Sequence, residues 1–144
     1  MEYNKAFFRT FENFFLVLKE RFGEKVALSV VREVMERNLK EAYDGMEFRF
    51  GKPEDFARVV GARDKSLGLK VEFPEVSKNR IVYRFYTDPF PGLKGKVNHK
   101  EFDDTYLSFK LRYLLGEDWD YITTQHIWDD APFTEHIIFK RETS

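Results

Sequence analysis

The chain has 144 residues, of which 42% are hydrophobic and 34% are charged. This length and composition fit one folded domain and exclude a disordered chain, which would contain fewer large apolar residues. Because 24 Lys and Arg are balanced by 25 Asp and Glu, the chain lacks the basic excess of a general nucleic-acid binder. The absence of Cys excludes disulfides, zinc–thiolate sites and Cys nucleophiles. We expect a single domain over 1–144, with a helical hairpin at 1–43 and an α+β body at 44–144.

The N-terminal residues do not look like a targeting segment. Charges at Glu2, Lys5, Arg9 and Glu12 interrupt the apolar run that a signal peptide requires. No stretch approaches the roughly 20 uninterrupted apolar residues of a membrane-spanning helix. We therefore expect a cytoplasmic, soluble protein with neither a membrane nor a nucleic acid as its partner.

The first 43 residues predict two consecutive helices. Phe residues recur at spacings of one, three and four over residues 4–22, which gives one wide apolar stripe. Gly23 ends this helix, and a second amphipathic helix follows over 24–43. The chain contains 16 Phe, seven Tyr and two Trp, so we interpret the stripe as part of an aromatic-rich core. It could alternatively form a pocket wall or a dimer face.

The middle of the chain alternates between strand and helix patterns. Apolar and charged residues alternate over 46–50, which predicts a short strand. Pro53 followed by two acidic residues predicts a helix start, and Gly61 is expected to end that helix. Two further strands are expected over 69–73 and 81–86.

The last third of the chain predicts a capped helix and a β-hairpin. Asn98 with Glu101 resembles a capping box for a helix over 99–115. Alternating residues over 119–128 and 133–141 predict a hairpin. The fold class expected from all elements is α+β: a helical hairpin, then a mostly antiparallel sheet of about five strands with two further helices.

The C-terminal hairpin offers one pair of residues suited to acid–base chemistry. If Trp128 lies opposite Phe133, the register places His126 opposite Glu135 on the more apolar face. A buried His beside a carboxylate is a candidate general base with its orienting partner. The alternative is a structural pair, and a register change of one residue removes the pair altogether.

A weak metal-ligand pattern lies at the start of the predicted helix over 99–115. His99 and Asp103 are four residues apart and share one helix face. Two ligands do not make a site, so His126, Glu135 or His136 would have to complete it. The alternative is that the acidic residues only complement the helix dipole. The sequence contains neither a phosphate-binding glycine loop nor a GxSxG motif, and it leaves the cofactor unknown.

Four segments carry a resemblance to known families: Asp88–Phe90, Phe102–Tyr106, Leu114–Asp118 and Phe133–Ile137. In these segments and in the order of its elements the chain resembles the L-2-amino-thiazoline-4-carboxylic acid hydrolase-like family and the 4-vinyl reductase-type small-ligand-binding domain. The resemblance covers about residues 24–140. It implies an α+β architecture that either binds a small ligand or hydrolyses a small amide or cyclic amidine.

The chain departs from this family pattern at its cysteines. In both groups a Cys commonly precedes the first Pro, and further Cys residues occur near the last helix and the last strand. The corresponding positions here are Asp88, a position near Asp103, and Thr134. Functions of the families that depend on those thiols therefore do not transfer to this chain.

Three function hypotheses follow. The first is a small-molecule-binding domain of the 4-vinyl reductase type, with a pocket between the terminal sheet and the helix at 99–115; the expected lining residues are Tyr83, Tyr106, Tyr113, His126, Trp128 and Glu135. The second is a hydrolase of a small amide or cyclic amidine with His126 as base, Glu135 as its orienting partner, and Asp88 or Asp103 as a second acid or metal ligand. The third is a structural or interaction subunit that pairs its Phe-rich helices in a homodimer or with a partner.

Overall fold

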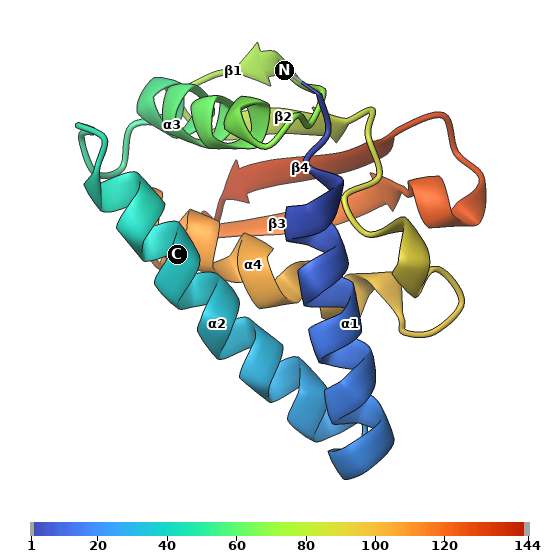
Figure 1. Ribbon diagram of the computed structural model, residues 1–144. Helices are drawn as coiled ribbons and strands as arrows, with labels where there is room; N and C mark the ends of the chain where they lie inside the picture. The colour runs from blue at the N-terminus through green and yellow to red at the C-terminus, as the bar shows by residue number, and fades with distance from the viewer. Residues whose placement is uncertain (1, 143–144) are drawn as a thin grey trace.

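The computed structural model describes residues 2–142 and arranges them as four helices and one sheet (Figure 1). The order of elements is α1 (Lys5–Phe22), α2 (Glu24–Asp44), α3 (Pro53–Ser66), β1 (Val71–Val76), β2 (Arg80–Phe85), α4 (His99–Leu114), β3 (Trp119–Gln125) and β4 (Thr134–Lys140). Short 3₁₀ turns lie at Pro91–Leu93 and Ile127–Asp129.

The N-terminal helical hairpin is confirmed. Asn4 caps α1 by accepting a hydrogen bond from the backbone N–H of Phe7 (3.1 Å). Gly23 joins the two helices with φ of +90°, in the left-handed region that favours glycine. No helix within residues 2–142 is both long enough and apolar enough to cross a membrane.

The sheet has the strand order β1-β2-β4-β3, and all neighbouring strands are antiparallel. Tyr83 on β2 bonds to Asp64 of α3, and Tyr121 on β3 donates a hydrogen bond to Asp104 of α4 (2.7 Å). Both tyrosines pack against His136 on β4 between them. The helices α3 and α4 therefore lie on the same face of the sheet.

The core lies between this face of the sheet and the helices, and aromatic rings dominate it. Phe102 of α4 is fully buried and packs edge-on against Phe15 of α1 and Phe90, with ring centroids 5.4 and 4.9 Å apart. The helix α4 packs against both α2 and β3. This placement explains why its apolar surface is wide, as the sequence predicted.

The strand expected at residues 46–50 does not form, so the sheet has four strands and not five. Met46 and Phe48 do pack against the core, but Phe50 is 65% exposed. The backbone N–H of Arg49 donates to Asp55 in the first turn of α3 (2.7 Å). Local hydrogen bonds to α3 thus replace the ladder that a strand would need.

Two element boundaries also differ from the expected ones. The helix α3 continues through Gly61 to Ser66, and the Phe73 ring of β1 packs next to this glycine. The strand β1 continues past Pro74. It is an edge strand, where a missing backbone donor is tolerated, and its register shifts between Glu72 and Glu75.

The burial of Phe102 predicts a large stability effect. Replacing it with Ala removes a ring from a filled part of the core and should lower the free energy of unfolding by about 3–5 kcal/mol. Urea titration followed by circular dichroism measures this change. Phe14→Ala on the 45% exposed Phe14 is the matched control and should cost less than about 1 kcal/mol. Equal losses in both variants would contradict the core assignment.

Candidate functional site

The C-terminal hairpin adopts a different register from the one that the sequence predicted. Thr123 pairs with His136 and Gln125 pairs with Glu135, with one extra residue, Thr124, on β3 between these two pairs. This bulge ends the regular alternation before residue 126. The predicted pairing of His126 with Glu135 is therefore wrong.

The buried face of the hairpin is also the opposite of the expected one. Ile122 is 55% exposed, whereas His136 and Ile138 on the other face are completely buried. Glu135 points away from the helices and binds Arg84 (2.7 Å) and Thr124 (2.8 Å). The helices cover the face with Ile138, so this face is the buried one. The other face has more apolar residues but is not covered by helices.

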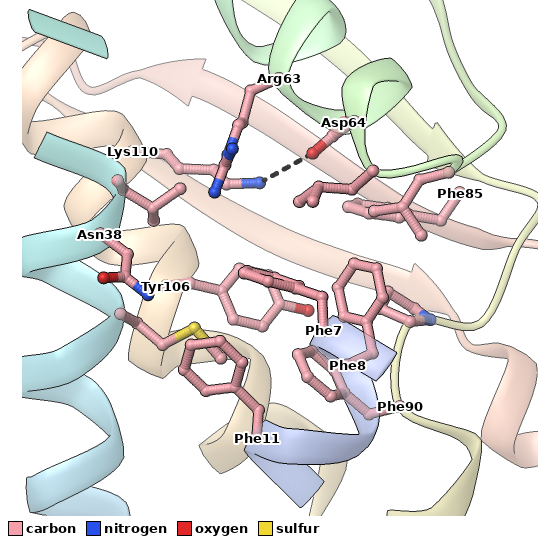
Figure 2. Close-up of a pocket in the computed structure, with 15 residues that line it drawn as sticks. Phe7, Phe8, Phe11, Asn38, Arg63, Asp64, Phe85, Phe90, Tyr106 and Lys110 are labelled. Carbon is pink, nitrogen blue, oxygen red and sulfur yellow. Dashed lines mark ion pairs between the residues drawn. The ribbon is translucent and has the colours of Figure 1, made fainter. Parts of the chain in front are cut away.

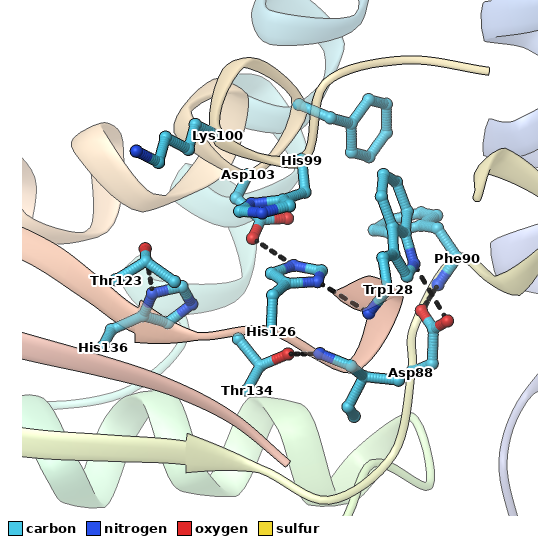
Figure 3. Close-up of polar contacts among 12 residues, drawn as sticks. Asp88, Phe90, His99, Lys100, Asp103, Thr123, His126, Trp128, Thr134 and His136 are labelled. Carbon is cyan, nitrogen blue, oxygen red and sulfur yellow. Dashed lines mark hydrogen bonds and ion pairs between the residues drawn. The ribbon is translucent and has the colours of Figure 1, made fainter. Parts of the chain in front are cut away.

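His126 instead turns inward and forms a network with α4 (Figure 3). It is 5% exposed, and its Nε2 lies 2.9 Å from Oδ2 of Asp103. Its Nδ1 accepts a hydrogen bond from the backbone N–H of Trp128 (3.0 Å), which caps the 3₁₀ turn. Since Nδ1 is an acceptor, the ring proton lies on Nε2 and is donated to Asp103.

This arrangement determines what His126 can do chemically. A general base needs a free lone pair within reach of a substrate proton. The lone pair on Nδ1 is already used by Trp128, and Nε2 carries the proton that Asp103 accepts. As arranged, the imidazole positions the chain after β3 and is not free to accept a proton.

The structure brings His99 to the same place. The rings of His99 and His126 stack with centroids 4.0 Å apart, and ligand atoms of His99, Asp103 and His126 lie within 4.8 Å of one another (Figure 3). The Nε2 atom of His99 lies 3.0 Å from Asp129. Its buried Nδ1 has no hydrogen-bond partner among the described residues. The weak ligand candidates His99 and Asp103 therefore lie next to His126, one of the three residues that were expected to complete a metal site.

A metal ion at this cluster would require a change in the network. A neutral His that binds a metal through Nε2 carries its proton on Nδ1. At His126 that proton would face the N–H of Trp128, so two donors would oppose each other. The cluster as it stands is built as a hydrogen-bonded network rather than as a metal centre.

Asp88 and Trp128 belong to the same network. Both oxygens of Asp88 are occupied: one accepts from the backbone N–H of Phe90 and the other from the indole Nε1 of Trp128, each at 2.9 Å. Burial raises the pKa of Asp88. A hollow of about 10 Å³ lies beside these side chains, also lined by His126, which is about the space of one water molecule.

The two remaining tyrosine candidates lie in different places. Tyr113 stacks on Phe109 (5.0 Å) and bonds to Asp44 on the outer side of α4, away from the other candidates. Tyr83 is fully buried and bonds to Asp64.

A larger cavity opens between α1, α2, α3 and α4 (Figure 2). Its volume is about 50 Å³, room for a few water molecules or a small organic molecule, since one water needs roughly 10–15 Å³. Tyr106 is the one expected ligand-binding residue that lines it directly. The lining residues are Phe7, Phe8, Phe11, Met35, Asn38, Leu39, Arg63, Asp64, Leu67, Leu69, Phe85, Pro89, Phe90, Tyr106 and Lys110.

A buried ion pair forms the polar floor of this cavity (Figure 2). Lys110 Nζ lies 3.7 Å from Asp64 Oδ1, and both side chains are 5% exposed. Lys110 also donates to the Tyr83 hydroxyl (3.3 Å), which in turn donates to Asp64. Burial lowers the pKa of Lys110 and raises that of Asp64, because a charge is poorly solvated in this core.

Asp64 and Lys110 were not among the site residues predicted from the sequence. One signal could have found the lysine: Lys110 lies four residues after Tyr106 and three before Tyr113, within an aromatic stripe of α4. A lysine on the apolar face of a helix is either extended to the surface or buried with a partner. No comparable signal marks Asp64, whose partners come from distant parts of the chain.

A scan against protein-family models finds no match for this chain, and no curated protein matches it. The resemblance to the 4-vinyl reductase-type domain and the hydrolase-like family therefore stays a prediction.

His136 gives this region a testable pH dependence. Burial lowers the pKa of His136 from 6.5 to about 4, so below pH 6.5 the unfolded chain binds a proton that the folded chain does not. Stability should therefore fall as the pH decreases from 6.5 toward 4, by about 2 kcal/mol between pH 7 and pH 5 from this group. Urea titrations of the unmodified protein and of His136→Gln at both pH values measure the difference. An equal pH dependence in the two proteins would contradict this assignment.

Proposed function

We propose that the protein binds a small molecule in the cavity between the four helices, as the resemblance to the 4-vinyl reductase-type domain implies. The observation that carries the proposal is a buried ion pair, Asp64 with Lys110, at the floor of a cavity with otherwise mainly apolar walls. Apolar walls with a few convergent polar groups are typical of ligand sites.

The cavity's dimensions limit the class of ligand. A volume of about 50 Å³ is well below the roughly 300 Å³ at which sites for larger ligands begin. A ligand of few atoms fits, with its apolar body against Phe8, Phe11 and Phe90 and one polar group toward Lys110. The charged residues that line the cavity are two basic ones, Arg63 and Lys110, and one acidic one, Asp64. The lining therefore carries one excess positive charge.

The geometry favours this function over the hydrolase alternative. That alternative needs His126 as a free base oriented by Glu135, with Asp88 as a second acid. In the structure His126 has no free lone pair, Glu135 binds Arg84 on the opposite face, and both oxygens of Asp88 accept hydrogen bonds.

Blocking the mouth of the cavity tests the proposal. Asn38 is a half-buried lining residue, so Asn38→Trp should cover the opening without disturbing the buried core. Aliphatic fragments of few atoms should raise the melting temperature of the unmodified protein and lose this effect in Asn38→Trp. Thermal-shift measurements across a fragment set give both results.

Arg37→Trp is the matched control, because Arg37 is the exposed neighbour on α2 and does not line the cavity. It should keep the full thermal response. If no fragment stabilises the unmodified protein, or if both variants respond alike, the cavity is not the binding site.

One observation favours the alternative of an interaction subunit. Four apolar side chains of the helical hairpin are exposed by more than two fifths: Phe14 (45%), Val17 (49%), Phe22 (62%) and Val26 (43%). Exposed apolar side chains that lie together are typical of association surfaces. This hypothesis takes a second copy of the chain as the partner.

Sedimentation tests the homodimer. If the hairpins pair, the protein should sediment as a dimer, and Phe14→Ser combined with Phe22→Ser should shift it to a monomer because the apolar contact is lost. Ile122→Ser is the control: Ile122 is 55% exposed but lies on β3, so this variant should stay dimeric. A monomer at every concentration of the unmodified protein would exclude this alternative.

A further inference from the structure

Lys110 is a rare, almost fully buried lysine. Lysine is buried only when it has a partner, and Lys110, which is 4% exposed, lies at the floor of the cavity beside Asp64 (Figure 2). Its ammonium group lies over the rings of Tyr83, Phe85 and Tyr106, at 5.2–5.7 Å from their centroids.

The partners of this ammonium group hold it loosely. Charge-assisted hydrogen bonds between N and O are usually about 2.7–2.9 Å long, whereas Lys110 lies 3.7 Å from Asp64 and 3.3 Å from the Tyr83 hydroxyl. Burial lowers the pKa of the amine. Desolvation in an apolar pocket is a known way to activate a lysine as a nucleophile.

A route for the proton is also in place. Asp64 Oδ1 faces the nitrogen directly, and the Tyr83 hydroxyl accepts from Lys110 while it donates to Asp64. Burial raises the pKa of Asp64, so its carboxylate can take up the ammonium proton and return it.

We propose that Lys110 condenses with the carbonyl group of a small aldehyde or ketone in this cavity, forming a reversible imine and releasing water. This inference rests on the cavity being the binding site proposed above. It names the substrate class of that site as a carbonyl compound with a short apolar body.

The reaction balances with the groups present. Asp64 takes one proton from the ammonium, and the free amine forms an N–C bond to the carbonyl carbon as the oxygen takes up a second proton from the nitrogen. Asp64 then returns its proton to the carbinolamine hydroxyl, the C–O bond breaks, and water leaves. The net change converts ammonium and carbonyl into a protonated imine and water, and Asp64 ends as the carboxylate.

Reductive trapping tests the inference on the full chain. Acetaldehyde or propanal is added at neutral pH with sodium cyanoborohydride, which reduces an imine to a stable secondary amine, and peptide mapping by mass spectrometry locates the added group. A lowered pKa raises the free-amine fraction of a lysine at neutral pH. We expect Lys110 to be labelled faster than every exposed lysine at pH 7, and this difference to shrink as the pH approaches 10.

Two variants control for labelling elsewhere. Lys110→Met should lose the fast labelling, and Lys78→Met, which changes an exposed lysine in the turn between β1 and β2, should keep it. If Lys110→Met does not fold, peptide mapping of the unmodified protein still decides, because the labelled lysine is identified directly. Labelling spread over exposed lysines, with Lys110 no faster than the rest, overturns the inference.

Ethanol and propan-1-ol separate this inference from the proposed function. They match the two probes in size but have no carbonyl group, so they test the cavity alone. If the alcohols raise the melting temperature while the aldehydes fail to label Lys110, the imine is wrong and the binding site stands. If neither the alcohols nor the aldehydes act on the protein, both proposals fall.

Discussion

The packing of the helices on the sheet depends on one buried polar contact. Asp64 from α3, Lys110 from α4 and Tyr83 from β2 meet in a mainly apolar interior. The contact joins three elements that are distant in sequence. Removing one partner of such a pair leaves an uncompensated charge, which costs about 3–5 kcal/mol, so the three elements are constrained to one arrangement.

The same contact borders the cavity, because Asp64 and Lys110 both line it. Tyr106 connects it to the second polar cluster: its ring lies 5.2 Å from Lys110 Nζ, and its hydroxyl donates to Asp103 (2.8 Å). A ligand against Tyr106 would therefore contact the residue that holds Asp103 and, through it, His126.

The sequence was informative about this second cluster but not about its chemistry. The spacing of His99 and Asp103 on a helix capped by Asn98 was predictable, and the structure has that cap and that shared face. The partner of His126 was not predictable, because the whole hairpin adopts another register than the alternating pattern suggests and an extra residue in β3 precedes His126, which then meets Asp103 of α4. A bulge leaves no signal in the alternation of apolar and polar residues. The sequence pattern therefore predicts regular strand pairing up to residue 128, whereas the regular pairing ends before residue 126.

The sequence by itself determined the elements whose signals are local: the helical hairpin around Gly23, the cap at Asn98 and the antiparallel α+β character. Tertiary structure decided the rest. Residues 46–50 have a strand pattern but find no strand to pair with, and the more apolar face of the C-terminal hairpin is the one that the helices leave uncovered. Asp64 meets Lys110 only when α3 and α4 pack on the same face of the sheet. Such contacts form between residues far apart in the chain, and local periodicity does not record which distant surface a side chain will meet.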